Sequence, residues 1–229
     1  MKTVGLLGGM SWESTIGYYQ SINRGVREKL GGLSSAQIVL YSVNFEPVER
    51  HQRNGDWPAA SEILSDAARK IESAGADFLL VCTNTMHKVY DDISLSVGIP
   101  VLHIADATAE RLKATGVSKV GLIGTRFTME QAFYKDRLQS LHGIDVVVPQ
   151  KSDRTIIHKV IYEELCRGVV SQASKKTYLE IVKKLALNGA QAVILGCTEI
   201  GLLIAQKDTE VPLVDTTEIH AEKAVELLI

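Results

Sequence analysis

Short apolar runs alternate along the chain with longer segments in which apolar residues recur every three or four positions. The short runs of the first half, which suit strands, are Val4–Leu7, Gln37–Val43, Phe78–Cys82 and Pro100–Ile104. Between them lie helical patterns such as Ile16, Tyr19, Ile22, Val26 and Leu30. Strands that alternate with helices predict parallel sheets covered by helices on both faces.

The second half of the chain repeats this pattern. The run Val120–Gly124 matches Val4–Gly8 at an offset of 116 residues, and 189–199 match 75–85 without a gap at an offset of 114. We therefore predict an α/β fold made of two pseudo-symmetric, doubly wound parallel-sheet domains. Their expected bounds are 1–103 plus 215–229, with the final helix packing back on the first domain, and 104–214, with a ligand site between the two domains.

Two matched strand ends carry the strongest candidate chemistry. One half reads Val81-Cys82-Thr83-Asn84-Thr85, and the other reads Leu195-Gly196-Cys197-Thr198-Glu199. Ligands of such sheets bind beyond the carboxyl ends of the strands. Two proton-carrying groups, Thr83 and Cys197, on opposite sides of one small pocket are what a stereoinverting enzyme needs.

Cys197 and Thr83 differ in how readily their side chains can act as a base. A helix that begins after Cys197 would stabilise a thiolate and lower the pKa of the thiol. Cys197 could instead be an inert buried cysteine, which is common. Thr83 is a weak base without activation and could merely cap a helix. Cys82 is the alternative nucleophile, but neighbouring strand residues point to opposite faces, and the repeat selects Thr83.

Several polar groups could surround a small ligand at these strand ends. Asn84-Thr85 in the first half and Thr198-Glu199 in the second offer side-chain donors and backbone N–H groups that suit a carboxylate, although helix capping alone would also explain them. A polar loop with Arg50, Gln52 and Arg53 could grip a second carboxylate or could simply be solvated.

Two glycine-containing turns, Gly8-Gly9 and Gly124-Thr125, also lie at this predicted edge. The spacing around Gly8 departs from the dinucleotide fingerprint, so close approach of the backbone to a small ligand is the favoured explanation. Thr128 and Gln131 form a capping-box pair that predicts the start of the following helix. His87, His103 and His220 lack zinc-type spacing, so we predict a structural or supporting role for them and no metal site.

Bulk composition narrows the class further. The chain has 229 residues, of which 45% are hydrophobic, and a formal net charge of −2. This charge gives no indication of a nucleic-acid or membrane partner. No apolar run is long enough to span a bilayer, and the N-terminus lacks the features of a signal peptide. Three cysteines without ligand spacing predict a reduced, cytoplasmic protein with free thiols.

These motifs resemble the cofactor-independent aspartate/glutamate racemase family, in which both halves end matching strands in a catalytic cysteine. The second motif, Leu195-Gly196-Cys197-Thr198-Glu199-Ile200, is intact. The first is typically Cys-Asn-Thr-x-His and here has threonine at position 83, as in the Thr/Cys branch of enterobacterial type. The opening Gly5–Ser11 is also similar, and the resemblance covers nearly the whole chain.

The resemblance implies an isomerase that racemises aspartate, glutamate or a similar small amino acid without pyridoxal phosphate or a metal, as a homodimer. It implies that Cys197 and Thr83 are the acid/base pair and that Asn84, Thr85 and Thr198 hold the α-carboxylate. Met10 and Thr125 would line the pocket, and Gln52 is the expected loop contribution. The alternatives are another isomerase or decarboxylase of the superfamily, a non-catalytic binder of acidic amino acids, and a pyridoxal-phosphate enzyme.

Overall fold

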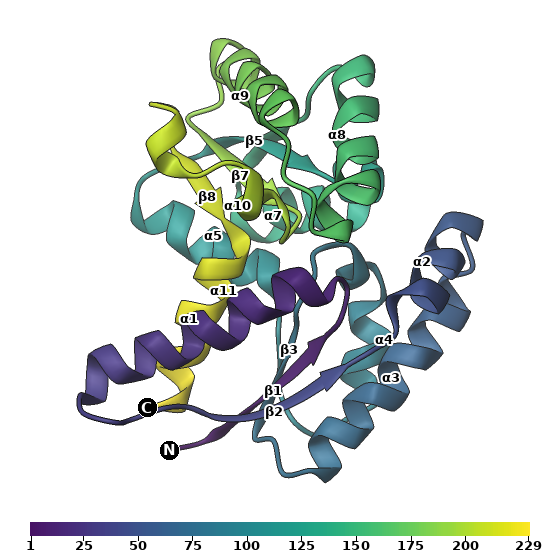
Figure 1. Ribbon diagram of the computed structural model, residues 1–229, viewed down its shortest axis with the longest axis vertical. Helices are drawn as coiled ribbons and strands as arrows, with labels where there is room; N and C mark the ends of the chain where they lie inside the picture. Colours follow the sequence, from purple (N-terminus) through teal and green to yellow (C-terminus); the bar gives the residue numbers. More distant parts are fainter. The chain divides into compact units, whose positions relative to one another are not determined.

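The computed structural model describes residues 1–229 and divides them into two compact units. Unit 1 comprises Met1–Ile104 and His220–Ile229, and unit 2 comprises Ala105–Ile219. Each unit is an α/β domain built on one four-stranded parallel sheet (Figure 1).

The two sheets have the same strand order, β2-β1-β3-β4 in unit 1 and β6-β5-β7-β8 in unit 2. The predicted α/β fold with two repeated parallel sheets is therefore confirmed. The strands are β1 (Thr3–Gly8), β2 (Gln37–Ser42), β3 (Phe78–Val81), β4 (Val101–Leu102), β5 (Lys119–Gly124), β6 (Asp145–Val147), β7 (Ala192–Gly196) and β8 (Leu213–Asp215).

Helices of the first half connect and cover its strands. They are α1 (Trp12–Leu30), α2 (Phe45–Asn54), α3 (Trp57–Ser73), the 3₁₀ helix η1 (Thr85–Val89) and α4 (Tyr90–Leu95). The second half has α5 (Ile104–Ala114), α6 (Arg126–Glu130), α7 (Ala132–His142), α8 (Lys151–Glu163), η2 (Leu165–Arg167), α9 (Gln172–Leu187), α10 (Ile200–Leu203), η3 (Gln206–Asp208) and α11 (Thr216–Leu228).

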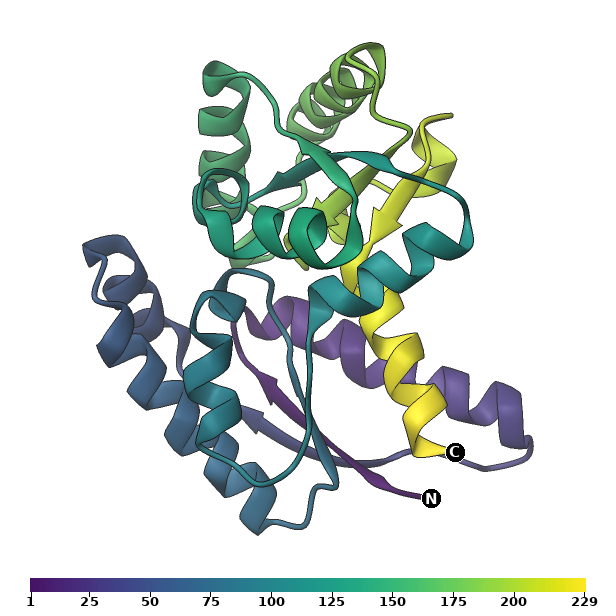
Figure 2. The same ribbon diagram turned by 180° about the vertical axis from the view of Figure 1, so that it is seen from behind.

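Alternation along the strands of unit 1 gives two cores, one on each face of its sheet. Leu7, Leu79 and Val81 pack against α3 on one face. Val4, Leu6 and Leu80 pack on the other face against α1 and the second half of α11. Figures 1 and 2 show both helices beside this sheet. Four residues of the final helix, Ala221, Ala224, Val225 and Leu228, are buried in this second core.

The sheet of unit 2 is packed in the same way. Ile123, Val193 and Leu195 face α8, α9 and α10 in a core that also contains Cys197. Figure 2 shows α5 and α7 on the opposite face of this sheet. The sequence pattern that predicted parallel strands buried on both faces is thus present in each half.

The segment with Arg50, Gln52 and Arg53 is a helix, α2, so the prediction of a polar loop was wrong. Asn44 caps its start, where the side-chain oxygen accepts from the Glu46 amide at 3.3 Å, and Gly55 ends it with a φ of 72°. Both are ordinary helix signals. Hydrophobic periodicity missed the helix because only Val48 and Gln52 of its ten residues are buried.

The glycines at the ends of the central strands permit close packing of the chain on itself. A β-carbon on Gly124 would lie 2.6 Å from the carbonyl oxygen of Gly196 on the neighbouring strand. Gly9 adopts a φ of 91°, and a β-carbon there would lie 2.4 Å from the Val43 carbonyl oxygen. Close contacts within the protein therefore explain why Gly9 and Gly124 have no side chain. The sequence had suggested instead that the backbone approaches a ligand at these turns.

Substitution of Gly124 by alanine should lower the free energy of unfolding by about 1–3 kcal/mol, because the added methyl group meets a rigid backbone carbonyl. Gly17, inside α1, has no neighbour within 4 Å of such a methyl group. The Gly17→Ala control should therefore stabilise the protein by roughly 0.5–1 kcal/mol. Urea denaturation measures both changes, and equal effects would contradict the close strand packing.

Candidate active site

The first group of predicted site residues lies where β3 ends in unit 1. Thr83, Asn84 and Thr85 are 8%, 1% and 4% exposed, so each is nearly buried. Cys82 points to the opposite face and is fully buried in the core with α1 and α11. Its place inside this core, on the face away from Thr83, argues against Cys82 as the alternative nucleophile. Burial also raises the pKa of its thiol strongly.

His87 holds this turn in place through its two ring nitrogens. Its Nδ1 lies 2.8 Å from the carbonyl oxygen of Thr83, and its Nε2 accepts from the Ile104 amide at 3.1 Å. A carbonyl only accepts and a backbone amide only donates, so His87 is a neutral imidazole protonated on Nδ1. The sequence predicted a structural or supporting role for His87. In the structure His87 binds the backbone of Thr83.

Met10 and Gln52 also belong to unit 1, and both are 2% exposed. Met10 lies in the turn between β1 and α1 and packs in the same core as Met86. The Gln52 amide donates to the Met86 sulfur at 2.8 Å. Gln52 is therefore held beside the segment that follows Thr83, while Arg50 and Arg53 on the same helix are exposed.

The second group lies where β7 ends in unit 2. Cys197, Thr198 and Glu199 are 7%, 5% and 2% exposed. The Cys197 thiol donates to Glu199 Oε2 at 2.9 Å, and the Thr198 hydroxyl donates to the same oxygen at 3.1 Å. The sequence named Glu199 only with Thr198, as a group that could suit a carboxylate, and gave it no role toward the cysteine. Its position two residues after the cysteine was the available signal.

The electrostatics of Cys197 differ from the sequence-based expectation. The following helix, α10, has four residues and begins at Ile200, a single turn that offers little dipole. Burial raises the pKa of the Cys197 thiol well above its usual value, and the nearby Glu199 charge raises this pKa further. A hydrogen bond from the Glu199 backbone amide acts to lower this pKa but does not outweigh the other two effects. The expectation of a lowered thiol pKa was therefore wrong in its net direction.

Thr125 lies at the carboxyl end of β5 in unit 2 and is 4% exposed. It is the N-cap of α6, and its hydroxyl oxygen accepts from the Thr128 amide at 3.3 Å. The predicted capping box of Thr128 and Gln131 was wrong, because the helix begins three residues earlier than expected.

Asp215 is a further acidic group at this edge that the sequence did not single out. It ends β8, next to β7, and its carboxylate accepts from the Thr217 amide at 2.8 Å. Burial raises the pKa of Asp215 to about 6. A β-carbon on Gly201 would clash with Asp215 Oδ2, so the chain just after Glu199 lies directly against this carboxyl group.

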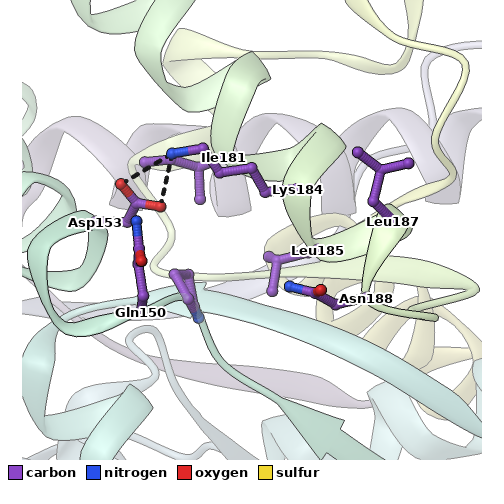
Figure 3. Close-up of a pocket in the computed structure, with 8 residues that line it drawn as sticks. Gln150, Asp153, Ile181, Lys184, Leu185, Leu187 and Asn188 are labelled. Carbon is purple, nitrogen blue, oxygen red and sulfur yellow. Dashed lines mark hydrogen bonds and ion pairs between the residues drawn. The ribbon is translucent and has the colours of Figure 1, made fainter.

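A separate pocket of about 230 Å³ lies in unit 2 and contains none of the predicted site residues (Figure 3). Its polar walls are Gln150, Asn188 and the ion pair of Lys184 with Asp153, at 3.0 Å, and its apolar residues include Ile181 and Leu185. Because the lysine and the aspartate satisfy one another, this pocket offers no unpaired charge from that pair for a ligand.

The structure has neither a metal-type cluster of side chains nor a membrane-spanning helix. No group of three or more His, Cys, Asp or Glu side chains is arranged to hold a metal ion. No helix combines the length and the apolar character needed to cross a membrane.

Comparison with known proteins places the chain in a family. The Asp/Glu/hydantoin racemase family model matches residues 7–224. The broad specificity amino-acid racemase RacX of Bacillus subtilis is 22% identical over 234 residues, which cover 97% of this chain and 96% of RacX.

Two solved structures are similar over the whole chain. A Yersinia pestis protein assigned to the Asp/Glu racemases is 53% identical, with a TM-score of 0.91 and coverage of 100% of this chain and 99% of that one. An aspartate racemase homologue from Pyrococcus horikoshii is 37% identical, with a TM-score of 0.85 and the same coverage.

The chain belongs to the Asp/Glu/hydantoin racemase family. It is an enzyme of the isomerase class, an amino-acid racemase.

His220 provides a pH-dependent test of the buried polar network of unit 1. Its Nδ1 lies 3.0 Å from the Tyr18 hydroxyl, and its Nε2 lies 3.0 Å from the Leu102 carbonyl oxygen. Burial lowers the pKa of His220 to about 3. The folded protein therefore keeps His220 neutral where the unfolded chain, with a pKa near 6.5, takes up a proton.

The stability that neutral His220 contributes is complete above about pH 6.5 and is lost as the pH falls toward about 3, by roughly 1.4 kcal/mol per pH unit. His220→Gln, whose amide can still donate to the Leu102 carbonyl, should remove this component of the slope. Urea denaturation at pH 7 and pH 5 measures it. Parallel pH dependences in the variant and the wild type would contradict the assignment.

Proposed function

We propose that this racemase inverts a small acidic amino acid, aspartate, glutamate or a close relative, without pyridoxal phosphate or a metal. Cys197 and Thr83 are its acid/base pair in this proposal. The family membership supports the reaction class, and the chemistry of the two strand ends supports the choice of residues.

The observation that carries the proposal is the equivalent position of Thr83 and Cys197 in two sheets of the same order. Val81 pairs with Leu7 of β1, and Leu195 pairs with Ile123 of β5. Thr83 and Cys197 each follow these paired strand residues by two positions. In a duplicated α/β fold this is the edge where ligands bind, so both groups are suited to act on one α-carbon.

In the proposed reaction, the Cys197 thiolate removes the α-proton from the L-enantiomer. The electron pair moves into the α-carboxylate, which gains enolate character and needs hydrogen-bond donors. Thr83, or a water molecule that it holds, delivers a proton to the other face. His87 supports this step by fixing the backbone at Thr83.

Asn84, Thr85 and Thr198 are proposed to hold the α-carboxylate. Thr198 would turn its hydroxyl from Glu199 to the substrate to do so, since the free site directs that proton at the Glu199 carboxylate. Met10 and Thr125 would line the pocket, and the buried Gln52 amide would contact the side chain of the substrate. The family resemblance supports a homodimer. The free thiols support a location in the cytoplasm.

Cys197→Ser should lower the rate of α-hydrogen exchange by on the order of 10²–10⁴, because a hydroxyl is a much weaker acid than a thiol. Proton NMR of L-aspartate and L-glutamate in D₂O with the protein measures this rate. Cys166→Ser is the matched control and should exchange like the wild type. A Cys197 variant with most of the wild-type exchange would exclude Cys197 from the reaction.

An absence of exchange in the wild type with every amino acid tried would instead favour a non-catalytic binder of acidic amino acids.

Thr83 should make proton exchange unequal on the two faces of the substrate. The L-enantiomer should exchange its α-hydrogen faster than it inverts, because the stronger base, Cys197, serves the L-face, and the D-enantiomer should exchange slowly. Thr83→Cys should bring the rate of inversion closer to that of exchange. NMR combined with chiral chromatography gives both rates.

The assignment of Thr83 would be wrong if wild-type inversion already kept pace with L-exchange. It would also be wrong if Thr83→Cys slowed inversion while circular dichroism showed a folded protein.

A further inference from the structure

The Glu199 carboxylate is the nearest acid/base partner of the Cys197 sulfur in the structure. Its Oε2 atom accepts from the thiol at 2.9 Å and from the Thr198 hydroxyl at 3.1 Å. Only 2% of Glu199 is exposed. A carboxylate is rarely buried in this way unless hydrogen bonds compensate for its lost hydration.

A purely local structural role does not account for the direction of this side chain. Glu199 occupies the N-cap position of α10, yet its side chain makes no capping hydrogen bond to that helix. The carboxylate instead turns back toward the thiol two residues earlier. The carboxylate is therefore hydrogen-bonded to the cysteine and the threonine at the strand end.

The buried thiol faces a physical difficulty as a base. Burial and the adjacent carboxylate both raise the pKa of Cys197, so loss of its proton to water would place a second negative charge in a site that is nearly sealed from solvent. Transfer of that proton along the existing hydrogen bond adds no charge, because the single negative charge moves from oxygen to sulfur.

We propose that Glu199 is the proton acceptor that converts the Cys197 thiol into the thiolate. The Cys197 S–H bond breaks, an O–H bond forms on Glu199 Oε2, and the electron pair stays on sulfur. The two side chains then form one dyad that carries a single negative charge. This inference rests on the proposed function, because the thiolate is the base that removes the α-proton.

The dyad has a signature in the pH dependence of thiol reactivity. Thiolate, rather than thiol, reacts with alkylating agents. While the pair holds one negative charge, its small thiolate fraction is set by internal transfer and does not change with pH. A thiol that ionises to water alone would instead gain thiolate tenfold with each pH unit below its pKa.

The experiment measures the rate at which iodoacetamide alkylates Cys197 across neutral pH, by mass spectrometry of the peptide that contains it. This readout distinguishes Cys197 from Cys82 and Cys166 and needs no substrate. The variants are Glu199→Gln, which removes the proton acceptor, and Glu199→Asp, which keeps a carboxylate on a shorter side chain. Glu180→Gln is the matched control, since Glu180 is an exposed glutamate on α9 of the same unit.

Wild type and Glu180→Gln should show a pH-independent plateau of alkylation. Glu199→Gln should lose the plateau, with a neutral-pH rate lower by on the order of 10² and rising tenfold per pH unit. Glu199→Asp should retain a plateau at a lower level, which also preserves the test if the Gln variant does not fold. The proposal is overturned if Glu199→Gln keeps the plateau or alkylates faster at neutral pH, as it would if Glu199 only held the thiol protonated.

A parallel α-hydrogen exchange profile separates this inference from the proposed function. In one outcome, α-hydrogen exchange needs Cys197 but has the same rate and pH profile in Glu199→Gln as in the wild type. That outcome would exclude the dyad and would leave the proposed racemase reaction unaffected. In another outcome, the wild type shows the alkylation plateau, Glu199→Gln loses it, and no amino acid exchanges its α-hydrogen. That outcome would establish the dyad and exclude the proposed substrates.

Discussion

Each sheet depends on the hydrogen-bonded pairing of its two central strands, β1 with β3 in unit 1 and β5 with β7 in unit 2. This pairing fixes the register, and the register decides which side chain emerges at the carboxyl edge. A slip of one residue would exchange Thr83 for Cys82 at that edge, because alternate residues face opposite sides. Glycines at the strand ends let the backbones approach closely enough to keep this alignment.

The polar groups near these strand ends are held in uncharged or shared states. His87 is neutral because one ring nitrogen lies beside a carbonyl and the other accepts from a backbone amide. Burial keeps His220 neutral by lowering its pKa. Cys197 and Glu199 share one hydrogen bond in which the thiol keeps its proton. Net charge therefore stays low in regions with little water, which limits the desolvation cost of burying functional groups.

The sequence predicted the fold well because strands buried on both faces give unmistakable apolar runs, and because these runs occur twice. It predicted less well where a polar surface helix left few buried positions: in α2, only Val48 and Gln52 are buried, so the caps Asn44 and Gly55 were the better signal. Helix capping by Thr125 was missed because Thr128, three residues later, is also a suitable capping residue.

For the candidate site, the sequence predicted the positions of the residues but not the directions of their side chains. Motif position located Thr83 and Cys197 at matched strand ends, and the structure bears out their register. The direction of the Glu199 side chain and the raised pKa of Cys197 depend on burial and on rotamers, which spacing alone does not determine. The same holds for the link between His87 and the Thr83 carbonyl, although both residues were visible in one short motif.

The last helix has a consequence for the order in which the chain folds. α11 begins in unit 2 and ends in unit 1, where Ala224 and Val225 complete the core and the Lys2 amide donates to the Leu228 carbonyl at 3.1 Å. Unit 2 is continuous in sequence, whereas unit 1 needs both ends of the chain (Figures 1 and 2). During synthesis on the ribosome, unit 2 can therefore complete its fold before unit 1. Unit 1, although most of it is synthesised earlier, is completed only when the final residues of the chain have emerged.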